Sequence, residues 1–238
     1  MNITEFLELC EVNNIDCGER EAQMLSDFAD FLLSENEHYN LTAIKEPRAL
    51  MLRHLIDSLT LLPHIPPNAH ILDIGSGAGF PAIPIAVLRP DVTVTALDST
   101  AKKIAFISAA TQKLRLSNIT AIHARAEELA HDTAYREKFS VVTARAVSHL
   151  RILCELSAAY LVPDGVLLAM KGEPMQTETE LSESAITARV GLTYQNTHSL
   201  TLRDPAADET LARTIVTMKK TGTTPVSYPR RYSQIVKK

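Results

Sequence analysis

The sequence has 238 residues, of which 45% are hydrophobic and 22% are charged, and this excludes a disordered, fibrous or disulfide-stapled chain. It suits one large domain, or one domain with an extension. Lys and Arg number 24 against 28 Asp and Glu, so the net charge of -4 excludes a general polycation. No apolar run approaches the roughly 18 residues of a membrane span. The first residues carry Glu5, Glu8 and Glu11 instead of a basic flank, so we expect no signal peptide.

The three cysteines are Cys10, Cys17 and Cys154, an odd number in no metal-ligand spacing. They predict reduced thiols in a cytoplasmic protein, with Cys154 in the core. The histidines also have no ligand spacing, so the sequence predicts no metal site. We expect a monomer, although the sequence does not fix the oligomeric state.

The positive charge is concentrated at the end of the chain. Residues 219–238 hold six Lys or Arg and no acid, so residues 1–218 carry a net charge of -10. Tyr228 and Tyr232 lie among these charges. A basic, aromatic tail is able to bind a polyanion such as RNA, through phosphates and base stacking. The alternative is a solvated tail that only keeps the chain soluble.

Residues 1–67 predict an N-terminal helical extension. Apolar residues recur at helical spacing in two stretches, around residues 3–10 and 25–32, and Thr4 is the expected cap of the first helix. A further amphipathic stretch follows Pro47, with Met51, Leu55, Leu59 and Leu62 on one face. Prolines 63, 66 and 67 end it and form a linker into the next region.

Residues 68–220 alternate between strand and helix patterns, and residues 221–238 form the basic tail. Strands are predicted at 71–74, 92–97, 119–122, 139–143 and 166–170, and helices from 81, at 101–116, at 150–161 and at 173–190. Two last strands, 192–202 and 211–218, are expected to pair antiparallel. The predicted fold is α/β, with a mostly parallel seven-stranded sheet and helices on both faces.

A glycine-rich turn follows the first predicted strand, in the sequence Asp-Ile-Gly-Ser-Gly-Ala-Gly-Phe-Pro of residues 73–81. Glycines permit unusual backbone angles and close approach of a ligand, and the next helix offers free N–H groups to an anion. Asp98 ends the second strand, 19 residues after Gly79, where such folds place a carboxylate for ribose hydroxyls.

The glycine spacing separates two cofactor classes. An NAD site requires Gly-x-Gly-x-x-Gly, whereas this turn has Gly-x-Gly-x-Gly and places Phe80 where the third glycine would stand. The pattern instead resembles motif I of class I (Rossmann-like) S-adenosylmethionine-dependent methyltransferases. That resemblance implies S-adenosyl-L-methionine as the cofactor, with its methionine end at the turn.

The chain resembles the RsmG (GidB) family over roughly residues 36–232. The resemblance rests on Tyr-Asn-Leu-Thr at 39–42, Arg-His-Leu-Ile-Asp-Ser at 53–58, the stretch 75–90, Leu-Asp-Ser at 97–99, Arg-Ala-Glu-Glu at 125–128, Ala-Arg-Ala at 144–146 and Lys-Gly at 171–172. It implies transfer of a methyl group from S-adenosylmethionine to N7 of one guanine in small-subunit (16S) ribosomal RNA.

The same resemblance implies site residues. The expected cofactor contacts are Gly75, Gly77, Gly79, Phe80, Asp98, Ser99, Thr100, Ala126, Glu127 and Arg145. The expected RNA contacts are Arg53, His54, Lys171, Arg230 and Arg231. Several of these have simpler interpretations. Arg53 and Asp57 are spaced as a surface ion pair, and Arg145 could form a structural salt bridge instead of clamping a carboxylate or phosphate.

The residues that other base methylations need are missing. After the fourth strand the sequence reads Thr-Ala-Arg-Ala at 143–146, with no Asn/Asp-Pro-Pro-aromatic motif for amino-group methylation. The cysteines lie away from the turn, which does not favour a cysteine nucleophile. Guanine N7 has a free lone pair, so its methylation needs orientation more than a base. No general base is assigned; Arg145 and Lys171 are the candidates for a catalytic role.

Three other functions stay open from sequence alone. A small-molecule methyltransferase on the same fold would keep its activity without residues 219–238. A ribosome-binding factor would hold the cofactor without turning it over. An NAD enzyme would bind NAD in preference to S-adenosylmethionine.

Overall fold

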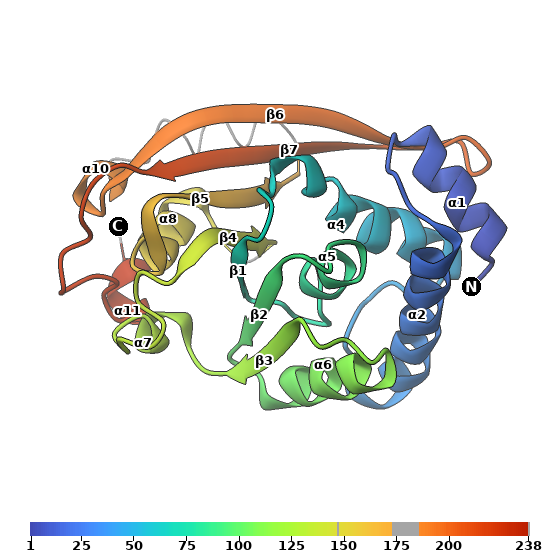
Figure 1. The fold of residues 1–238 in the computed structure, drawn as a ribbon, viewed down its shortest axis with the longest axis horizontal. Coiled ribbons are helices and arrows are strands. Elements are labelled where there is room, and N and C mark those ends of the chain that lie inside the picture. The colour runs from blue at the N-terminus through green and yellow to red at the C-terminus, as the bar shows by residue number, and fades with distance from the viewer. Residues whose placement is uncertain (147, 173–185, 238) are drawn as a thin grey trace.

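The structure, a computed structural model, describes residues 1–146, 148–172 and 186–237 (Figure 1). Seven strands form one sheet in the order β3-β2-β1-β4-β5-β7-β6. Their bounds are β1 His70–Ile74, β2 Thr93–Asp98, β3 Ile119–His123, β4 Phe139–Arg145, β5 Leu161–Lys171, β6 Leu192–Asp204 and β7 Glu209–Lys220. Strands β1 to β5 pair parallel, and β7 pairs antiparallel with both β5 and β6. The predicted fold class is confirmed, including the antiparallel pair at the end of the chain.

The helices that follow individual strands lie on both faces of the sheet. They are α5 Ala82–Leu88, α6 Ala101–Lys113, α7 Ala126–Leu129, α8 Leu150–Ala158, α10 Ile186–Arg189 and α11 Tyr232–Ile235. Successive residues of each central strand point to opposite faces of the sheet and pack in different hydrophobic clusters. Ile71 and Val141 belong to the cluster that α5 and α6 cover, whereas Leu72 and Val142 belong to the cluster that α8 covers. Burial on both faces explains why consecutive residues in these strands, such as Ile71-Leu72 and Val141-Val142, are apolar.

The N-terminal region forms helices α1 Ile3–Val12, α2 Glu19–Tyr39, α3 Pro47–Leu50 and α4 Asp57–Leu59. A π-helical stretch, η1 Met51–Ile56, joins α3 to α4, and a short 3-10 turn, η2 Leu62–His64, follows. The apolar faces of these helices pack into the same core as α5 and α6. Phe28 of α2, for example, lies with its ring centroid 5.2 Å from that of Phe80. The extension is therefore packed against the sheet domain.

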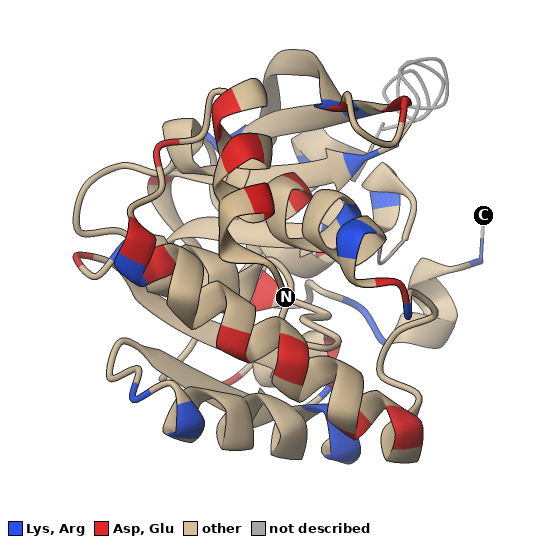
Figure 2. Ribbon diagram, turned by 90° about the vertical axis from the view of Figure 1, so that its right-hand side faces the viewer, with Lys and Arg blue, Asp and Glu red and all other residues tan. Residues whose placement is uncertain are grey.

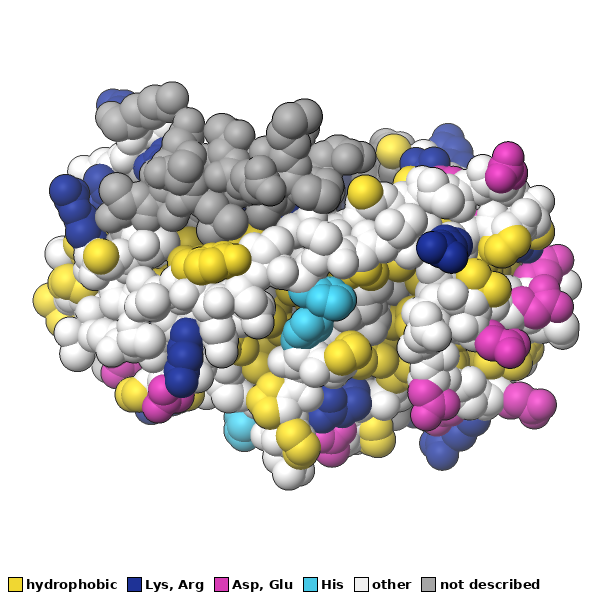
Figure 3. All heavy atoms as spheres, turned by 90° about the horizontal axis from the view of Figure 1, so that it is seen from above, with side chains coloured by type: hydrophobic (Ala, Val, Ile, Leu, Met, Phe, Trp, Pro, Cys, Tyr) yellow, Lys and Arg dark blue, Asp and Glu magenta, His cyan; other side chains and the backbone are white. Residues whose placement is uncertain are grey.

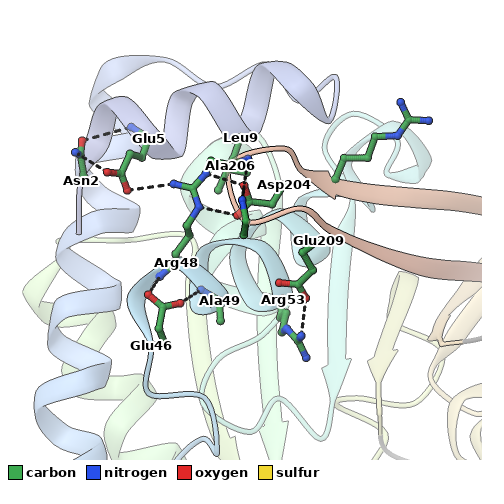
Figure 4. Close-up of polar contacts among 12 residues, drawn as sticks. Asn2, Glu5, Leu9, Glu46, Arg48, Ala49, Arg53, Asp204, Ala206 and Glu209 are labelled. Atoms are coloured by element: carbon green, nitrogen blue, oxygen red, sulfur yellow. Dashed lines mark hydrogen bonds and ion pairs between the residues drawn. The ribbon is translucent and has the colours of Figure 1, made fainter.

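Polar contacts also join this extension to the β6–β7 hairpin (Figure 4). Arg48 makes a bidentate contact with Asp204, in which Nε and Nη2 each lie 2.7 Å from a carboxylate oxygen, and it reaches Glu5 of α1 at 3.3 Å. Arg53 pairs with Glu209 at 2.5 Å. Planar bidentate ion pairs have a fixed geometry. The pair of Arg48 and Asp204 therefore fixes the position of the hairpin relative to the N-terminal helices.

Several expected boundaries were wrong. Asn2, whose side chain accepts from the Glu5 N–H, caps α1 in place of Thr4. Helix α6 ends at Lys113, not at residue 116. Helix α8 ends at Ala158 because Leu161 already pairs with Phe139 in the sheet. Of the helix expected at 173–190, residues 173–185 lie outside the described part of the chain, and α10 covers 186–189.

The acidic residues gather at the end of the molecule formed by the N-terminal helices. Residues 1–39 contain ten Asp or Glu and one Arg, a formal charge of -9. Figure 2 shows the red acidic positions along these helices, with blue basic positions spread over several neighbouring elements. Seen from above, the magenta side chains again lie toward that end, while the middle of this face is mainly uncharged (Figure 3). The acidic residues of the N-terminal sequence are thus also close together in space.

Candidate active site

The glycine turn after β1 is fixed against the end of β2. The backbone N–H groups of Gly75 and Ser76 both donate to the Leu97 carbonyl, at 2.7 and 3.1 Å. Gly77 N donates to Oδ2 of Asp98 at 3.0 Å. All three glycines of the turn have positive φ, of 71°, 59° and 91° for Gly75, Gly77 and Gly79, a region that glycine adopts without steric cost. The sequence motif therefore shapes a turn whose backbone faces the end of the neighbouring strand.

Asp98 is held by the backbone on both sides. Its Oδ1 accepts from Thr100 N at 2.8 Å, and Nζ of Lys103 lies 3.7 Å from Oδ2. The residue is only 6% exposed. A carboxylate has about four acceptor positions, so these contacts orient the group and leave acceptor capacity for ligand hydroxyls.

A cavity of about 400 Å³ lies at the carboxyl ends of the central strands, the place where open α/β sheets bind ligands. Seven of the expected cofactor residues line it. They are Gly75, Asp98, Ser99, Thr100, Ala126, Glu127 and Arg145. Further lining residues were not among the expected cofactor contacts. They are Ile74, Leu97, Lys103, Ala124, Arg125, Ala146, Leu156 and Tyr232. Tyr232 is the most distant of these in sequence, and only its place among the tail charges drew attention to it.

Three expected cofactor residues do not line this cavity: Gly77, Gly79 and Phe80. The two glycines shape the turn. At Gly79 the φ of +91° is strained for any other residue, and a β-carbon there would also lie 2.6 Å from Cδ1 of Ile83. Phe80 is 4% exposed and stacks on His54, with ring centroids 4.7 Å apart.

Arg145 brings the end of β4 together with the N-terminal extension. Its Nη1 donates to the carbonyl of Arg53 at 3.2 Å and to Oδ2 of Asp57 at 3.3 Å. Its Cζ lies 5.2 Å from the Phe80 ring centroid, in cation–π range. Asp57 also accepts from Nε of Arg213 at 2.9 Å. Two arginines thus share one buried carboxylate, and Arg145 also interacts electrostatically with the buried Asp73.

His54 completes this cluster as a neutral ring. Burial lowers its pKa to about 4, and the charge of Arg145 adds to the effect. Nδ1 of His54 lies 3.2 Å from Nη2 of Arg145 and 3.1 Å from the carbonyl oxygen of Arg53. Nε2 lies 2.8 Å from Oγ1 of Thr42, so both ring nitrogens have polar partners. Thr42 and His54 both belong to segments that carried the family resemblance.

The pairing of Arg53 with Asp57 suggested by their spacing is wrong. Arg53 binds Glu209 instead, and Asp57 binds Arg145 and Arg213. The stretch Met51–Ile56 is π-helical, which adds residues per turn and rotates side chains away from the i, i+4 geometry of an α-helix.

Asp73 precedes the glycines and is buried at the end of β1. Its Oδ1 accepts from Oγ1 of Thr143 at 2.9 Å. Burial raises its pKa to about 6, although Thr143 and Arg145 oppose the shift. The acid of the motif thus ties the end of β1 to β4 from inside the sheet.

The expected RNA residues occupy different environments. Lys171 ends β5, and its Nζ donates to the Ser148 carbonyl at 2.7 Å. Arg230 is bound to the buried Glu155, at 2.6 Å between Nη2 and Oε2, and its side chain is 36% exposed, so its contact with RNA stays a prediction. Arg231 is exposed. Arg53 and His54 belong to the cluster around Arg145.

A larger cavity, of about 850 Å³, lies elsewhere, between the α1–α2 connection, residues 59–64 and β6. None of the expected site residues lines it. Among the described residues, no group of three metal-ligating side chains comes together, and no helix is long and apolar enough to cross a membrane. The 400 Å³ cavity is therefore the candidate active site.

Solved structures of similar fold include methyltransferases, at low sequence identity. Precorrin-6y C5,15-methyltransferase from Geobacter metallireducens has a TM-score of 0.51 and 18% identity, covering 76% of this chain and 92% of its own. M. jannaschii TYW2, in complex with AdoMet, has a TM-score of 0.50 and 15% identity, covering 64% and 69%. At such identities the likeness establishes the fold.

Sequence comparison gives the family. The profile of the GidB family, described as rRNA small subunit methyltransferase G, matches residues 21–203. A protein named ribosomal RNA small subunit methyltransferase G from Desulfitobacterium hafniense (strain Y51) is 38% identical, covering 92% of this chain and 89% of its own. One of the same name from Lactobacillus acidophilus is 34% identical, covering 97% and 96%. The resemblance found in the sequence is confirmed, and the chain belongs to the rRNA small subunit methyltransferase G (GidB) family.

Proposed function

We propose that this protein transfers a methyl group from S-adenosylmethionine to N7 of a guanine in 16S ribosomal RNA. The observation that carries the proposal is that seven of the ten expected cofactor residues, drawn from four separate stretches of sequence, line one cavity at the strand ends. Family membership supplies the substrate class, small-subunit ribosomal RNA. Because that substrate is a cytoplasmic RNA, we expect the protein to act in the cytoplasm.

The residues around the cavity fit S-adenosylmethionine. Gly75 lines the cavity with a φ of 71° and no side chain, so its backbone is open to a ligand. A ribose suits the carboxylate of Asp98, which backbone N–H groups hold in place. Arg145 lines the cavity, and its guanidinium suits an anion, either the carboxylate of the cofactor or an RNA phosphate. When bound, S-adenosylmethionine supplies an electrophilic methyl group on a sulfonium.

The protein's own part in this reaction is orientation and electrostatics. Guanine N7 already carries a lone pair, so no residue has to remove a proton before attack. Within the described residues, the cavity is lined by no histidine or cysteine, and His54 beside it is neutral and fully engaged with Arg145 and Thr42. This set of groups suits holding the two reactants in line, a contribution that can reach about 7–11 kcal/mol.

The test uses labelled S-adenosylmethionine and small ribosomal subunits from a strain that lacks the enzyme. We expect label in 16S ribosomal RNA, and strand cleavage at the labelled guanine after borohydride and aniline treatment, which is specific to N7 methylation. The Asp98→Ala variant serves as the control and should transfer little label. Label that survives on an amino group or a pyrimidine would overturn the N7 assignment. Label only in small molecules would overturn the RNA substrate.

A further inference from the structure

The C-terminal segment, residues 221–236, is docked onto the protein and does not extend as a solvated tail. Arg136 donates to the carbonyls of Thr224 and Tyr228, each at 3.0 Å. Nη1 of Arg151 donates to the Ile235 carbonyl at 2.8 Å, and Ile235 is fully buried. Figure 1 shows the segment and α11 beside α7 and α8. Contacts along its whole length therefore fix its path.

The strongest anchor is the pair of Glu155 and Arg230. Glu155, in α8, is fully buried, and it accepts from the backbone N of Arg230 at 3.0 Å, from Nε at 2.8 Å and from Nη2 at 2.6 Å. Hydrogen bonds to a charged group in a bidentate geometry are the stronger kind. Because Arg230 and Ile235 are both held, the residues between them have a defined position.

Tyr232 lies between these two anchors and lines the proposed cofactor cavity. It also lines a neighbouring cavity of about 690 Å³, together with Arg125 and Glu127. These two residues line the 400 Å³ cavity as well. Tyr232 is 39% exposed, so part of its surface is accessible. It thus stands where the two cavities meet, beside α7.

The strand order identifies which end of the cofactor would lie there. The sheet runs β3-β2-β1, so the chain after β3, with Arg125 and Glu127, lies on the far side of Asp98 from the glycine turn. If the methionine end is at the turn and the ribose at Asp98, then the purine is at α7. Tyr232 lies at this end of the cavity.

We propose that Tyr232 is an aromatic residue against which the adenine of S-adenosylmethionine stacks, and that the docked C-terminal segment is part of the cofactor site. The inference rests on the proposed function for the identity of the ligand. Stacking needs only the ring, so the hydroxyl is dispensable. The pair of Glu155 and Arg230 acts at a distance, as a positioning device for the ring.

The first experiment uses fluorescence. The sequence contains no tryptophan, so Tyr232→Trp introduces a single indole fluorophore. Titration of this variant with S-adenosylhomocysteine should change the intensity and wavelength of its emission with a saturable profile. Tyr194→Trp is the matched control, because Tyr194 is an exposed tyrosine in β6, outside the cavity, and its emission should not change. If the Tyr232→Trp variant binds the ligand but its emission does not respond, the inference is overturned.

The second experiment measures affinity by calorimetry. Tyr232→Ala should raise the Kd for S-adenosylhomocysteine about 5- to 10-fold, as expected for loss of one stacking contact, and should raise the Kd for adenosine by the same factor. Tyr232→Phe should bind as the wild type does. Glu155→Gln should weaken binding and speed amide exchange within 221–236.

The outcomes separate this inference from the proposed function. Wild-type protein that fails to bind S-adenosylhomocysteine overturns both. Wild-type binding with an unchanged Kd in Tyr232→Ala overturns the stacking role alone, and an accompanying loss of RNA affinity would assign the ring to an RNA base. A loss for S-adenosylhomocysteine without a loss for adenosine would overturn its placement at the purine.

Discussion

The carboxylate of Asp57 lies 3.3 Å from the guanidinium of Arg145, although 88 residues of sequence separate them. Asp57 belongs to the N-terminal extension and Arg145 to the end of β4. Arg213 of β7 binds the other oxygen of the same carboxylate at 2.9 Å. The extension therefore contributes directly to the candidate site, since it supplies the counter-charge for two arginines and the neutral ring of His54 beside them.

Replacing Asp57 should affect both stability and methyl transfer. Asp57→Asn leaves Arg145 and Arg213 close together without a carboxylate, so we expect the free energy of unfolding to fall by about 2–3 kcal/mol and kcat/KM to fall at least about 10-fold. Urea unfolding and methylation of small subunits measure the two effects. Asp164→Asn is the control, because Asp164 pairs with Lys219 at the surface and such pairs contribute little. Equal behaviour of the two variants would contradict the role given to Asp57.

Two buried groups predict opposite pH dependences of stability. The pKa of Asp73 is raised to about 6 by burial, so the folded protein holds that proton more tightly, and stability falls as pH rises from about 4 to 6. The pKa of His54 is lowered to about 4 by burial and by Arg145, so stability rises as pH rises from about 4 to 6.5. In the wild type these two opposite changes of stability with pH largely cancel.

Single substitutions should reveal each slope. Relative to wild type, Asp73→Asn should become steadily more stable as pH rises from 4 to 6, by up to about 1.4 kcal/mol per pH unit. His54→Gln should show the opposite trend relative to wild type. Urea unfolding at half-unit steps from pH 4 to 7 measures both. Parallel pH profiles for the three proteins would show that neither pKa is shifted.

Two glycines should respond differently to alanine. Gly79 has φ of +91°, and a β-carbon there would lie 2.6 Å from Cδ1 of Ile83. Gly79→Ala should therefore cost about 1–3 kcal/mol of stability. Nothing lies within 4 Å of a β-carbon on Gly172, so Gly172→Ala should stay within about 0.5 kcal/mol of wild type. Thermal and urea unfolding compare them, and a neutral Gly79→Ala would show that the turn tolerates rearrangement.

The basic residues near the C-terminus should divide into two groups. Lys219 pairs with Asp164, Lys220 is buried, and Arg230 binds Glu155, whereas Arg231 and Lys237 are exposed. Replacing Arg231 and Lys237 by glutamine should flatten the plot of log affinity for RNA against log salt by about 0.7 to 0.9 per lost phosphate contact.

The matched control for this measurement is Lys113→Gln. Lys113 ends α6, and its Nζ lies 5.3 Å from the Phe31 ring centroid, on the N-terminal helices. Its loss should leave the salt dependence unchanged. If the double variant and Lys113→Gln give the same slope, the C-terminal segment does not contact RNA phosphates.

The sequence by itself determined the sheet, the glycine turn and the carboxylate of Asp98, because these depend on local signals: apolar runs, glycine at positions of positive φ, and the spacing from one strand end to the next. Only the tertiary structure decided the partners of Arg53, Asp57 and Arg230. A charged side chain pairs with the opposite charge that lies nearest in the folded protein. Spacing along one helix does not predict a partner on a strand or helix many residues away in the sequence. The position of Tyr232 was also decided only by the tertiary structure, because the buried carboxylate of Glu155 holds the segment that contains it.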